Sequence, residues 1–332
     1  MRVLVTGGAG FIAHHIIEEL LLNTHWEIVT LDNIDFSGNL NRLHDMLRKY
    51  PNLSKRVEFI YHDIKAEINP TLSKQIGEVN YILHLAAGSH VDRSIENPLN
   101  FVYTNVVGTC NVLNFARTQK NLKRFLYFST DEVFGPAPPE TNFTEYARYN
   151  SCSPYSATKA GGEELAVAFR NTYNLPVYVT HCMNVFGERQ QSGAFIPLCI
   201  KKILNDEKLI IHSDETLTKS PVRHYIYVKE VASAIRFLLD RDLESSDPLN
   251  KTPKFNIAGK DEIDILSLAR TIAIHLGKKL NYEMSHVQRP GSDMGYSLSA
   301  DLLKSLGWEP KTNFSDHIFK VIDWYNMNRD WL

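Results

Sequence analysis

Apolar runs of strand length alternate with longer segments of helical period through the first half of the chain. The runs are RVLVT, WEIVTLD, RVEFIYHD, NYILHLAA, KRFLYFST and LPVYVTHC. Strands that alternate with helices predict βαβ units around a parallel sheet, and right-handed crossovers place helices on both of its faces. After about residue 182 the alternation breaks up into shorter strands and helices. The pattern predicts an α/β fold with a doubly wound parallel sheet, followed by a smaller α/β domain.

Composition excludes several classes of protein. The chain has 332 residues and a formal net charge of −2, which gives no electrostatic reason to expect nucleic acid or an anionic membrane as partner. Its cysteines have no C-x-x-C spacing, which argues against a zinc site and against a disulfide framework; they are Cys110, Cys152, Cys182 and Cys199. The N-terminus shows no signal peptide, and no run of about 18 apolar residues predicts a membrane span. We therefore expect a soluble, cytoplasmic protein without a metal site.

A glycine-rich turn joins the first predicted strand to the first predicted helix. The stretch VLVTGGAGFIA places Gly7, Gly8 and Gly10 in this turn. Backbone N–H groups there, together with the helix N-terminus, can bind a pyrophosphate. The G-x-x-G-x-x-A spacing ends on Ala13, whose small side chain lets the helix lie close to the strand. The turn predicts a dinucleotide site.

Polar residues further along the chain extend this predicted site. Asp32 ends the second strand, where a carboxylate can accept from both ribose hydroxyls and would repel a 2′-phosphate, which favours NAD over NADP. Asp63 ends the third strand and is either a partner of the adenine amino group or a solvated strand-end acid. Asn105 lies among apolar helical neighbours, where a cofactor-side loop or a helix–helix contact would satisfy its amide equally well.

A tyrosine and a lysine open the helix after the fifth strand. In SPYSATKAGGEEL, Pro154 suits the first turn, and Tyr155 and Lys159 lie on one face because they are four residues apart. An ammonium near the phenol would lower its pKa from about 10 toward neutral pH. The tyrosine could then take a proton from an alcohol whose carbon loses hydride. Alone, the spacing also fits an exposed i, i+4 pair.

Two adjacent acids follow the fifth strand directly. In FSTDEVFGP, Asp131 and Glu132 come just after an apolar block of the kind found in strands buried on both faces. Ligands of open α/β sheets bind outside the C-terminal ends of the strands. The acids therefore either meet a substrate or form an exposed acidic turn.

The motifs TGGAGFIA, DN, HLAA, STDEVFG and YSATK together resemble the extended short-chain dehydrogenase/reductase family, over essentially the whole chain. The resemblance implies a Rossmann-type NAD-binding domain near 1–182 and a nucleotide-sugar-binding domain near 183–332, with the chain crossing back between them. It also implies a homodimer through helices near 98–118 and 155–172. The cofactor-binding residues implied are Gly7, Gly10, Phe11, Ile12, Asp32, Asn33, Asp63, Ile64, Leu85, Ala86, Ala87, Asn105, Tyr155 and Lys159.

Within that family, the Thr-Asp-Glu run and the stretches SHVDRSI (89–95) and RPGSD (289–293) are similar to those of nucleoside-diphosphate-glucose 4,6-dehydratases. These hydro-lyases convert dTDP-glucose or UDP-glucose into the 4-keto-6-deoxy sugar, and NAD is regenerated because it returns its hydride to C6. The resemblance makes Thr130, Asp131 and Glu132 catalytic together with Tyr155 and Lys159. Glu132 would remove the C5 proton, and Asp131, held protonated by the negative charge beside it, would protonate the leaving C6 hydroxyl. Thr130 would hydrogen-bond the C4 oxygen.

The substrate-binding residues implied are His90, Arg93, Thr130, Asn184, Arg223 and Arg289. For His90 and Arg93, helix-start capping and salt bridging is the alternative. The chain departs from the bacterial dehydratases at Gly193, Ala194 and Ser292, on the nucleotide side, so the choice between thymidine and uridine stays open. A 4-epimerase or decarboxylase of the same family would not need the two acids. A non-catalytic NAD-binding sensor would need neither the acids nor the Tyr–Lys pair.

Overall fold

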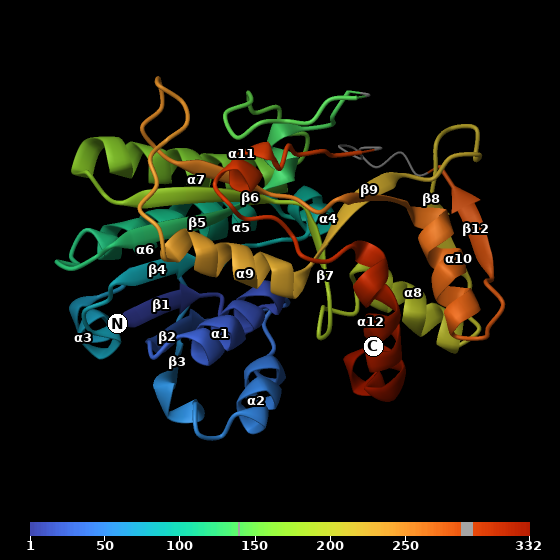
Figure 1. Ribbon diagram of the computed structural model, residues 1–332, viewed down its shortest axis with the longest axis horizontal. Coiled ribbons are helices and arrows are strands. Elements are labelled where there is room, and N and C mark those ends of the chain that lie inside the picture. Colours follow the sequence, from blue (N-terminus) through green and yellow to red (C-terminus); the bar gives the residue numbers. More distant parts are fainter. Residues whose placement is uncertain (139, 287–294) are drawn as a thin grey trace.

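The computed structural model describes residues 1–138, 140–286 and 295–332. Within these ranges seven strands form one parallel sheet, in the order β10-β6-β5-β4-β1-β2-β3 (Figure 1). This confirms the predicted α/β fold. The strands are β1 (Arg2–Thr6), β2 (Glu27–Asp32), β3 (Val57–Tyr61), β4 (Tyr81–His84), β5 (Arg124–Thr130), β6 (Val177–Cys182) and β10 (Lys254–Ile257).

Helices cover both faces of the sheet, because successive strand side chains point to opposite sides. Val3 and Val5 of β1 join the apolar core that contains α1 (Phe11–Asn23) and α9 (Val228–Leu239). Leu4, between them, joins the core on the opposite face, with residues of α6 and α7. The remaining helices of the first half are α2 (Leu40–Lys49), α3 (Pro70–Ile76), α4 (Val91–Glu96), α5 (Pro98–Val102), α6 (Gly108–Ala116) and α7 (Pro154–Tyr173), with short 3-10 turns at Ser54–Arg56 and Asp131–Phe134.

The segment predicted as one helix near 98–118 is interrupted. A π-helical stretch, Tyr103–Val107, separates α5 from α6 and contains Asn105. Such a stretch widens the helix by one residue per turn and is common at functional sites. Apolar periodicity does not reveal the change, since the inserted residue shifts the pattern only slightly.

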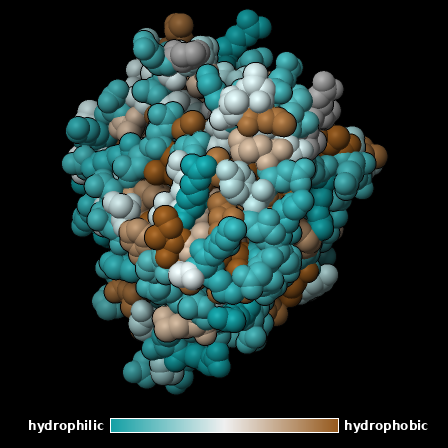
Figure 2. All heavy atoms as spheres, turned by 90° about the vertical axis from the view of Figure 1, so that its right-hand side faces the viewer, coloured by the Kyte–Doolittle hydropathy of each residue, from teal (hydrophilic) through white to brown (hydrophobic). Residues whose placement is uncertain are grey.

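The second half of the chain forms smaller sheets beside the large one. The described residues include a three-stranded sheet, β11-β9-β7, and a two-stranded sheet, β12-β8. This end of the molecule is largely hydrophilic, with separate apolar residues among the polar ones (Figure 2). Its elements are β7 (Asn184–Phe186), α8 (Phe195–Leu204), β8 (Leu209–His212), β9 (Val222–Tyr227), β11 (Asp261–Asp264), α10 (Ile265–His275), β12 (Tyr282–Ser285), α11 (Asp301–Ser305), α12 (Phe314–Met327) and a 3-10 turn at Arg329–Trp331.

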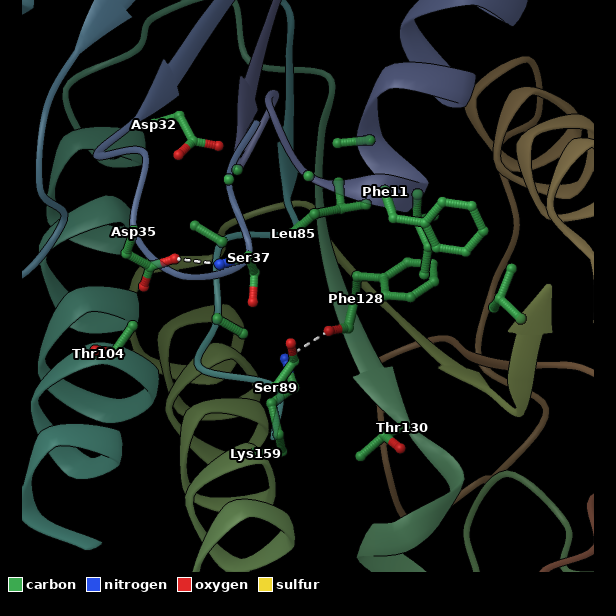
Figure 3. Close-up of a pocket in the computed structure, with 18 of the residues that line it drawn as sticks. Phe11, Asp32, Asp35, Ser37, Leu85, Ser89, Thr104, Phe128, Thr130 and Lys159 are labelled. Carbon is green, nitrogen blue, oxygen red and sulfur yellow. Dashed lines mark hydrogen bonds between the residues drawn. The ribbon is translucent and has the colours of Figure 1, made fainter. Parts of the chain in front are cut away.

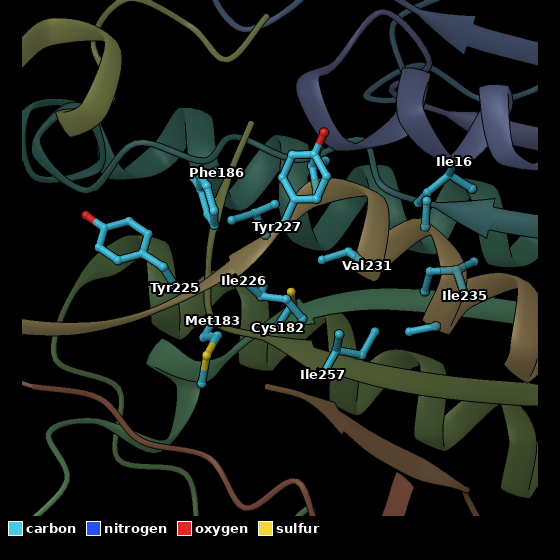
Figure 4. Packing of buried hydrophobic residues seen from close by; sticks show 14 of the residues in the cluster. Ile16, Cys182, Met183, Phe186, Tyr225, Ile226, Tyr227, Val231, Ile235 and Ile257 are labelled. Carbon is cyan, nitrogen blue, oxygen red and sulfur yellow. The ribbon is translucent and has the colours of Figure 1, made fainter. Parts of the chain in front are cut away.

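The chain returns to the large sheet after entering the second half. β10 pairs in parallel with β6, Lys254 lying opposite Val179 and Ile257 opposite Cys182. α9 packs against α1. Figure 4 shows this junction, where Ile235 of α9 and Ile257 of β10 pack with residues of the first half. The two halves therefore share one core.

Of the helices in the described ranges, none combines the length and the apolar character needed to cross a membrane.

Candidate active site

One cleft runs along the C-terminal ends of the parallel strands and gathers most of the predicted site residues (Figure 3). Its cavity volume is about 310 Å³. Ligands of open α/β sheets bind at this edge. The predicted residues that line it are Gly7, Gly10, Phe11, Ile12, Asp32, Asn33, Asp63, Ile64, Leu85, Ala86, Ala87, Thr130, Asp131, Glu132, Tyr155, Lys159 and Asn184.

The glycine turn can approach a phosphate closely. Gly7 has a positive φ of 75°, and a Cβ there would lie 2.8 Å from the backbone nitrogen of Ala86. A Cβ on Gly8 would lie 1.6 Å from Oγ1 of Thr30. Gly10 precedes the first turn of α1 without a side chain, so a phosphate can reach the N–H groups of that turn. The turn fits the pyrophosphate of a dinucleotide.

Asp32 organises the backbone around this turn. Its Oδ2 accepts from the N–H of Ala9 (2.9 Å), and its Oδ1 accepts from the N–H of Ile34 (2.7 Å). Burial raises the pKa of Asp32, and these two hydrogen bonds oppose the rise. A carboxylate oxygen can accept more than one hydrogen bond, so both oxygens can still receive ribose hydroxyls. Asp63 lines the cleft and pairs with Lys65, Nζ to Oδ2 3.2 Å.

Arg42 is a buried cation that the sequence did not single out. Its Nη1 donates to the carbonyls of Ala9 (2.9 Å) and Ser37 (2.6 Å), and its Nε donates to that of Arg189 (2.9 Å). One guanidinium thus ties together three backbone segments around the cleft. Burial lowers the pKa of Arg42 to about 10. Within the polar, amphipathic α2 the residue resembles a surface arginine, and no local signal distinguishes it.

The two acids lie where β5 ends. Thr130 Oγ1 donates to Asp131 Oδ1 (3.1 Å) and accepts from the N–H of Glu132 (3.4 Å). Asp131 is buried, and its Oδ2 has no hydrogen-bond partner among the described residues. Burial raises the pKa of Asp131 to about 6, against the opposing effects of Thr130 and Arg223. The rise agrees with an acid role for Asp131, but its cause is burial, whereas the sequence suggested the charge of the neighbouring acid.

Tyr155 and Lys159 face the same cleft from the first turns of α7. Ser153 and Ser156 form a capping box that fixes the start of this helix. Lys159 Nζ donates to the carbonyl of Phe128 (2.7 Å; Figure 3). Burial lowers the pKa of Lys159 to about 7, and the nearby Glu163 opposes this effect.

The expected lowering of the Tyr155 pKa by Lys159 does not occur in this structure. Burial raises the pKa of the Tyr155 phenol above its ordinary value, and the negative charge of Glu132 raises it further. A hydrogen bond with Thr130 opposes the rise. Desolvation of the phenolate is therefore the largest effect on the pKa of Tyr155.

The predicted substrate residues fall in different places. Asn184 lines the cleft, and its Nδ2 donates to the carbonyl of His224 (3.3 Å). Arg223, on β9, lowers the pKa of Asp131 by its charge, which places it near the acids. Arg289 lies outside the described residues, as does Ser292.

His90 and Arg93 are absent from the described cleft lining. The Nδ1 of His90 accepts from the N–H of Arg93 (3.5 Å) and caps α4, which is the alternative that the sequence left open for this histidine. The Arg93 guanidinium lies over the ring of Phe36, 3.1 Å from its centroid.

Asn105 joins a loop to a helix behind the cleft. Its Oδ1 accepts from the N–H of Gly88 (2.8 Å), and its Nδ2 donates to the carbonyl of Gly88 and to Oγ1 of Thr158. The amide therefore connects the loop after β4 to α7. Asn105 is not among the described lining residues. Both possibilities for this residue are met, because Gly88 lies in the loop between the lining residues Ala87 and Ser89, and Thr158 belongs to the helix α7.

A buried ion pair lies one turn beyond Lys159 on α7. Glu163 is fully buried, and its carboxylate meets Nζ of Lys254 (2.8 Å), Nε2 of His181 (3.1 Å) and the hydroxyl of Tyr149. Burial alone would raise the pKa of Glu163, but His181 and Lys254 hold it well below its ordinary value. The ion pair connects α7, β6, β10 and the segment between the acids and Tyr155.

Several lining residues escaped the sequence analysis, among them Ser89, Cys182, Met183, Gln190 and Gln191. Cys182 ends β6 opposite Thr130, so the strand-end rule applied to that strand would have found it. Gln190 and Gln191 come from a loop whose path no local pattern determines. In the described part of the chain, no three His, Cys, Asp or Glu side chains are grouped to hold a metal ion.

The parallel sheet, the glycine turn, the Tyr–Lys helix and the paired acids in one cleft define an enzyme of the extended short-chain dehydrogenase/reductase class. The chain belongs to the family described as GDP-mannose 4,6 dehydratase, whose model matches residues 4–321.

Curated relatives and solved structures agree with this assignment. The chain is 34% identical to a dTDP-glucose 4,6-dehydratase of Salmonella typhimurium, covering 100% of this chain and 94% of the relative. It is also 34% identical to a trifunctional protein of Arabidopsis thaliana that includes UDP-glucose 4,6-dehydratase activity, covering 99% of this chain and 48% of that protein. The crystal structure of a dTDP-glucose 4,6-dehydratase from Streptomyces venezuelae, with NAD bound, superposes with a TM-score of 0.87 at 31% identity, covering 100% of this chain and 98% of that one.

Proposed function

We propose that this enzyme is an NAD-dependent 4,6-dehydratase of dTDP-glucose, UDP-glucose or both. One observation carries the proposal beyond the family: Asp131 and Glu132 line the same cleft as Tyr155 and Lys159. Oxidation at one sugar carbon requires only a tyrosine and a cofactor. Elimination of water requires in addition a base and an acid, and paired carboxyl groups in different environments supply both.

The residues at one end of the cleft suit NAD. The N–H groups of the glycine turn and of the α1 N-terminus would hold the pyrophosphate, and Asp32 would hold the adenosine ribose. When bound, NAD would supply the hydride acceptor for C4 of the sugar and the hydride donor for C6.

The chain's own residues move the protons. Tyr155, hydrogen-bonded with Thr130, takes the proton of the C4 hydroxyl in its ionised form, which the positive charge of Lys159 in the same cleft favours. The resulting ketone makes the C5 proton acidic, and Glu132 removes it and returns a proton to C5 when hydride reaches C6. Asp131 gives its proton to the C6 hydroxyl, which leaves as water. Asp131 suits this role because its pKa, raised to about 6, leaves more of it protonated near neutral pH than an ordinary aspartic acid.

Mass spectrometry of dTDP-glucose and UDP-glucose after incubation with the purified enzyme tests the proposal. We expect the loss of one water from at least one of the two sugars without added NAD, because the cofactor is regenerated in each turnover. The two initial rates give the base preference. Unchanged mass for both sugars with NAD in excess would refute glucose dehydration, and an isomer of the same mass would indicate a 4-epimerase.

The acid role of Asp131 predicts a pH dependence. Asp131 must be protonated to act, and its pKa is about 6 in this structure. We expect kcat/KM, which reports ionisations of the free enzyme, to fall as the pH rises through about 6. The Asp131→Asn enzyme, measured over the same pH range at higher enzyme concentration, should not show this fall of kcat/KM. If kcat/KM of that variant still fell as the pH rose through about 6, the ionisation would belong to another group.

We also propose a homodimer through the helices near 98–118 and 155–172. Apolar side chains of the first of these segments and of α4 are exposed on the single chain, with exposed fractions of 37 to 57%; they are Ile95, Leu99, Val102, Tyr103 and Val107. A grouped set of this kind on helices is typical of a subunit interface. Light scattering should give a dimer for the wild type and a monomer for Leu99→Glu. A monomeric wild type would contradict the proposal.

A further inference from the structure

An exposed aromatic ring contacts a cation beside the cleft. Phe36 is 55% exposed, yet the Arg93 guanidinium lies over its ring, 3.1 Å from the ring centroid. The His90 ring meets it edge-on, with centroids 6.2 Å apart and an interplanar angle of 80°. Phe36 belongs to the loop of residues 33–38 after β2, whereas His90 and Arg93 belong to the start of α4. The contact therefore joins two segments that are far apart in the sequence.

The loop that carries Phe36 is fixed on both sides of its tip. Before the tip, the N–H of Ile34 donates to Asp32 Oδ1 (2.7 Å), and Ile34 has a positive φ of 51°. After the tip, the carbonyl of Ser37 accepts from Arg42 (2.6 Å). Both ends of this loop are therefore fixed by hydrogen bonds, and we call residues 33–38 the arch. The Phe36 ring projects from its tip toward α4.

The arch and the loop before α4 both contribute residues to the cleft. Asp35 and Ser37, the neighbours of Phe36, line it from the loop after β2, and Ser89, the neighbour of His90, lines it from the loop after β4 (Figure 3). Phe36, Arg93 and His90 themselves are absent from the described lining. Their contact therefore lies outside the described cleft lining and joins two segments that each contribute to it.

We propose that Phe36 and Arg93 form a clamp that holds bound NAD in the cleft and slows its release. The inference rests on the proposed NAD-dependent function. An enzyme that returns its hydride within each turnover has no need to exchange cofactor, so slow release does not limit its rate. Arginine suits the contact because its planar guanidinium stacks on an aromatic face. A lysine ammonium is not planar and stacks less well.

The release rate of NAD measures the clamp directly. The enzyme is loaded with radiolabelled NAD in the absence of sugar, and loss of label is followed after adding excess unlabelled NAD. Since a cation–π contact of this kind contributes about 0.5 to 2 kcal/mol, we expect Phe36→Ala to release NAD roughly two- to thirtyfold faster than wild type. Phe36→Tyr retains the ring and should release at the wild-type rate. Phe319→Ala, which removes a partly exposed ring from α12 that contacts His275, should also leave the rate unchanged.

A double variant identifies the partner. If Phe36 acts through Arg93, the Phe36→Ala/Arg93→Gln enzyme should release NAD no faster than the faster single variant, because both remove the same contact. If the rate increases of the two single variants multiplied in the double variant, Phe36 would not act through Arg93. An unchanged NAD release rate in Phe36→Ala would overturn the clamp. An enzyme that binds NAD and eliminates water, yet shows either result, refutes the clamp alone. A wild-type enzyme that binds no NAD refutes both the clamp and the proposed function.

Discussion

The Glu132→Gln enzyme should fold, bind NAD and oxidise the sugar at C4, yet form almost no dehydrated product. Glutamine keeps the size of the side chain but cannot remove the C5 proton, and a positioned general base typically contributes about a hundredfold to ten-thousandfold in rate. The substitution also removes a negative charge that raises the pKa of Tyr155, so the oxidation at C4 should not be impaired. Reduced cofactor should therefore accumulate on the enzyme, visible by its near-ultraviolet absorbance.

Exchange of the C5 hydrogen with deuterated water separates this step from the others. Wild-type enzyme should incorporate deuterium into the product, and Glu132→Gln should incorporate none into recovered substrate. Glu140→Gln makes the same chemical change on an exposed residue after the acids and should behave as wild type. Full dehydration by Glu132→Gln would eliminate this residue as the base.

Replacing Lys254 with methionine should destabilise the protein by about 3–5 kcal/mol, the usual cost of removing one partner of a buried ion pair. The side chains of Lys254 and Glu163 are 4% and 0% exposed, and their ion pair spans 2.8 Å. Without Lys254 the Glu163 carboxylate stays buried beside His181 and Tyr149. The free energy of unfolding, from urea titration followed by circular dichroism, should fall accordingly.

A surface ion pair of nearly the same length provides the matched control. Lys278 and Asp206 are 2.9 Å apart but are 36% and 70% exposed, so Lys278→Met should cost less than about 1 kcal/mol. The Glu163→Gln/Lys254→Met protein carries no unpaired charge and should recover much of the lost stability. If both lysine variants lost the same stability, burial would not be what makes the Glu163–Lys254 pair strong.

The sequence predicted the sheet and most of the cleft for a simple geometric reason. The carboxyl ends of parallel strands meet at one edge, so the residues that follow apolar runs, such as Asp32 and Asp131, must gather there. The glycine turn adds a sequence signature of the dinucleotide site that is contained within one short stretch of the chain. Asp32, Asp131 and Glu132 were accordingly found from one-dimensional patterns, whereas Leu85, Ala86 and Ala87 came from the family resemblance.

Other features depend on contacts that no local pattern encodes. Arg42 acquires its role from three carbonyls, which belong to Ala9, Ser37 and Arg189. The raised pKa of Tyr155 depends on burial and on Glu132, whereas the spacing to Lys159 alone suggested the opposite direction. His90 and Arg93 belong to a motif of the family, but their contacts in this structure are with the start of α4 and with Phe36.

The return of β10 to the large sheet limits how this enzyme can be recombined with its relatives. A chimaera with one crossover after residue 182 would import a foreign β10 beside β6 and a foreign α9 against α1. Each imported element would meet a core that did not evolve with it. To transfer base preference, an engineer should exchange the substrate-side segments as separate inserts and leave residues 228–239 and 254–257 with the recipient.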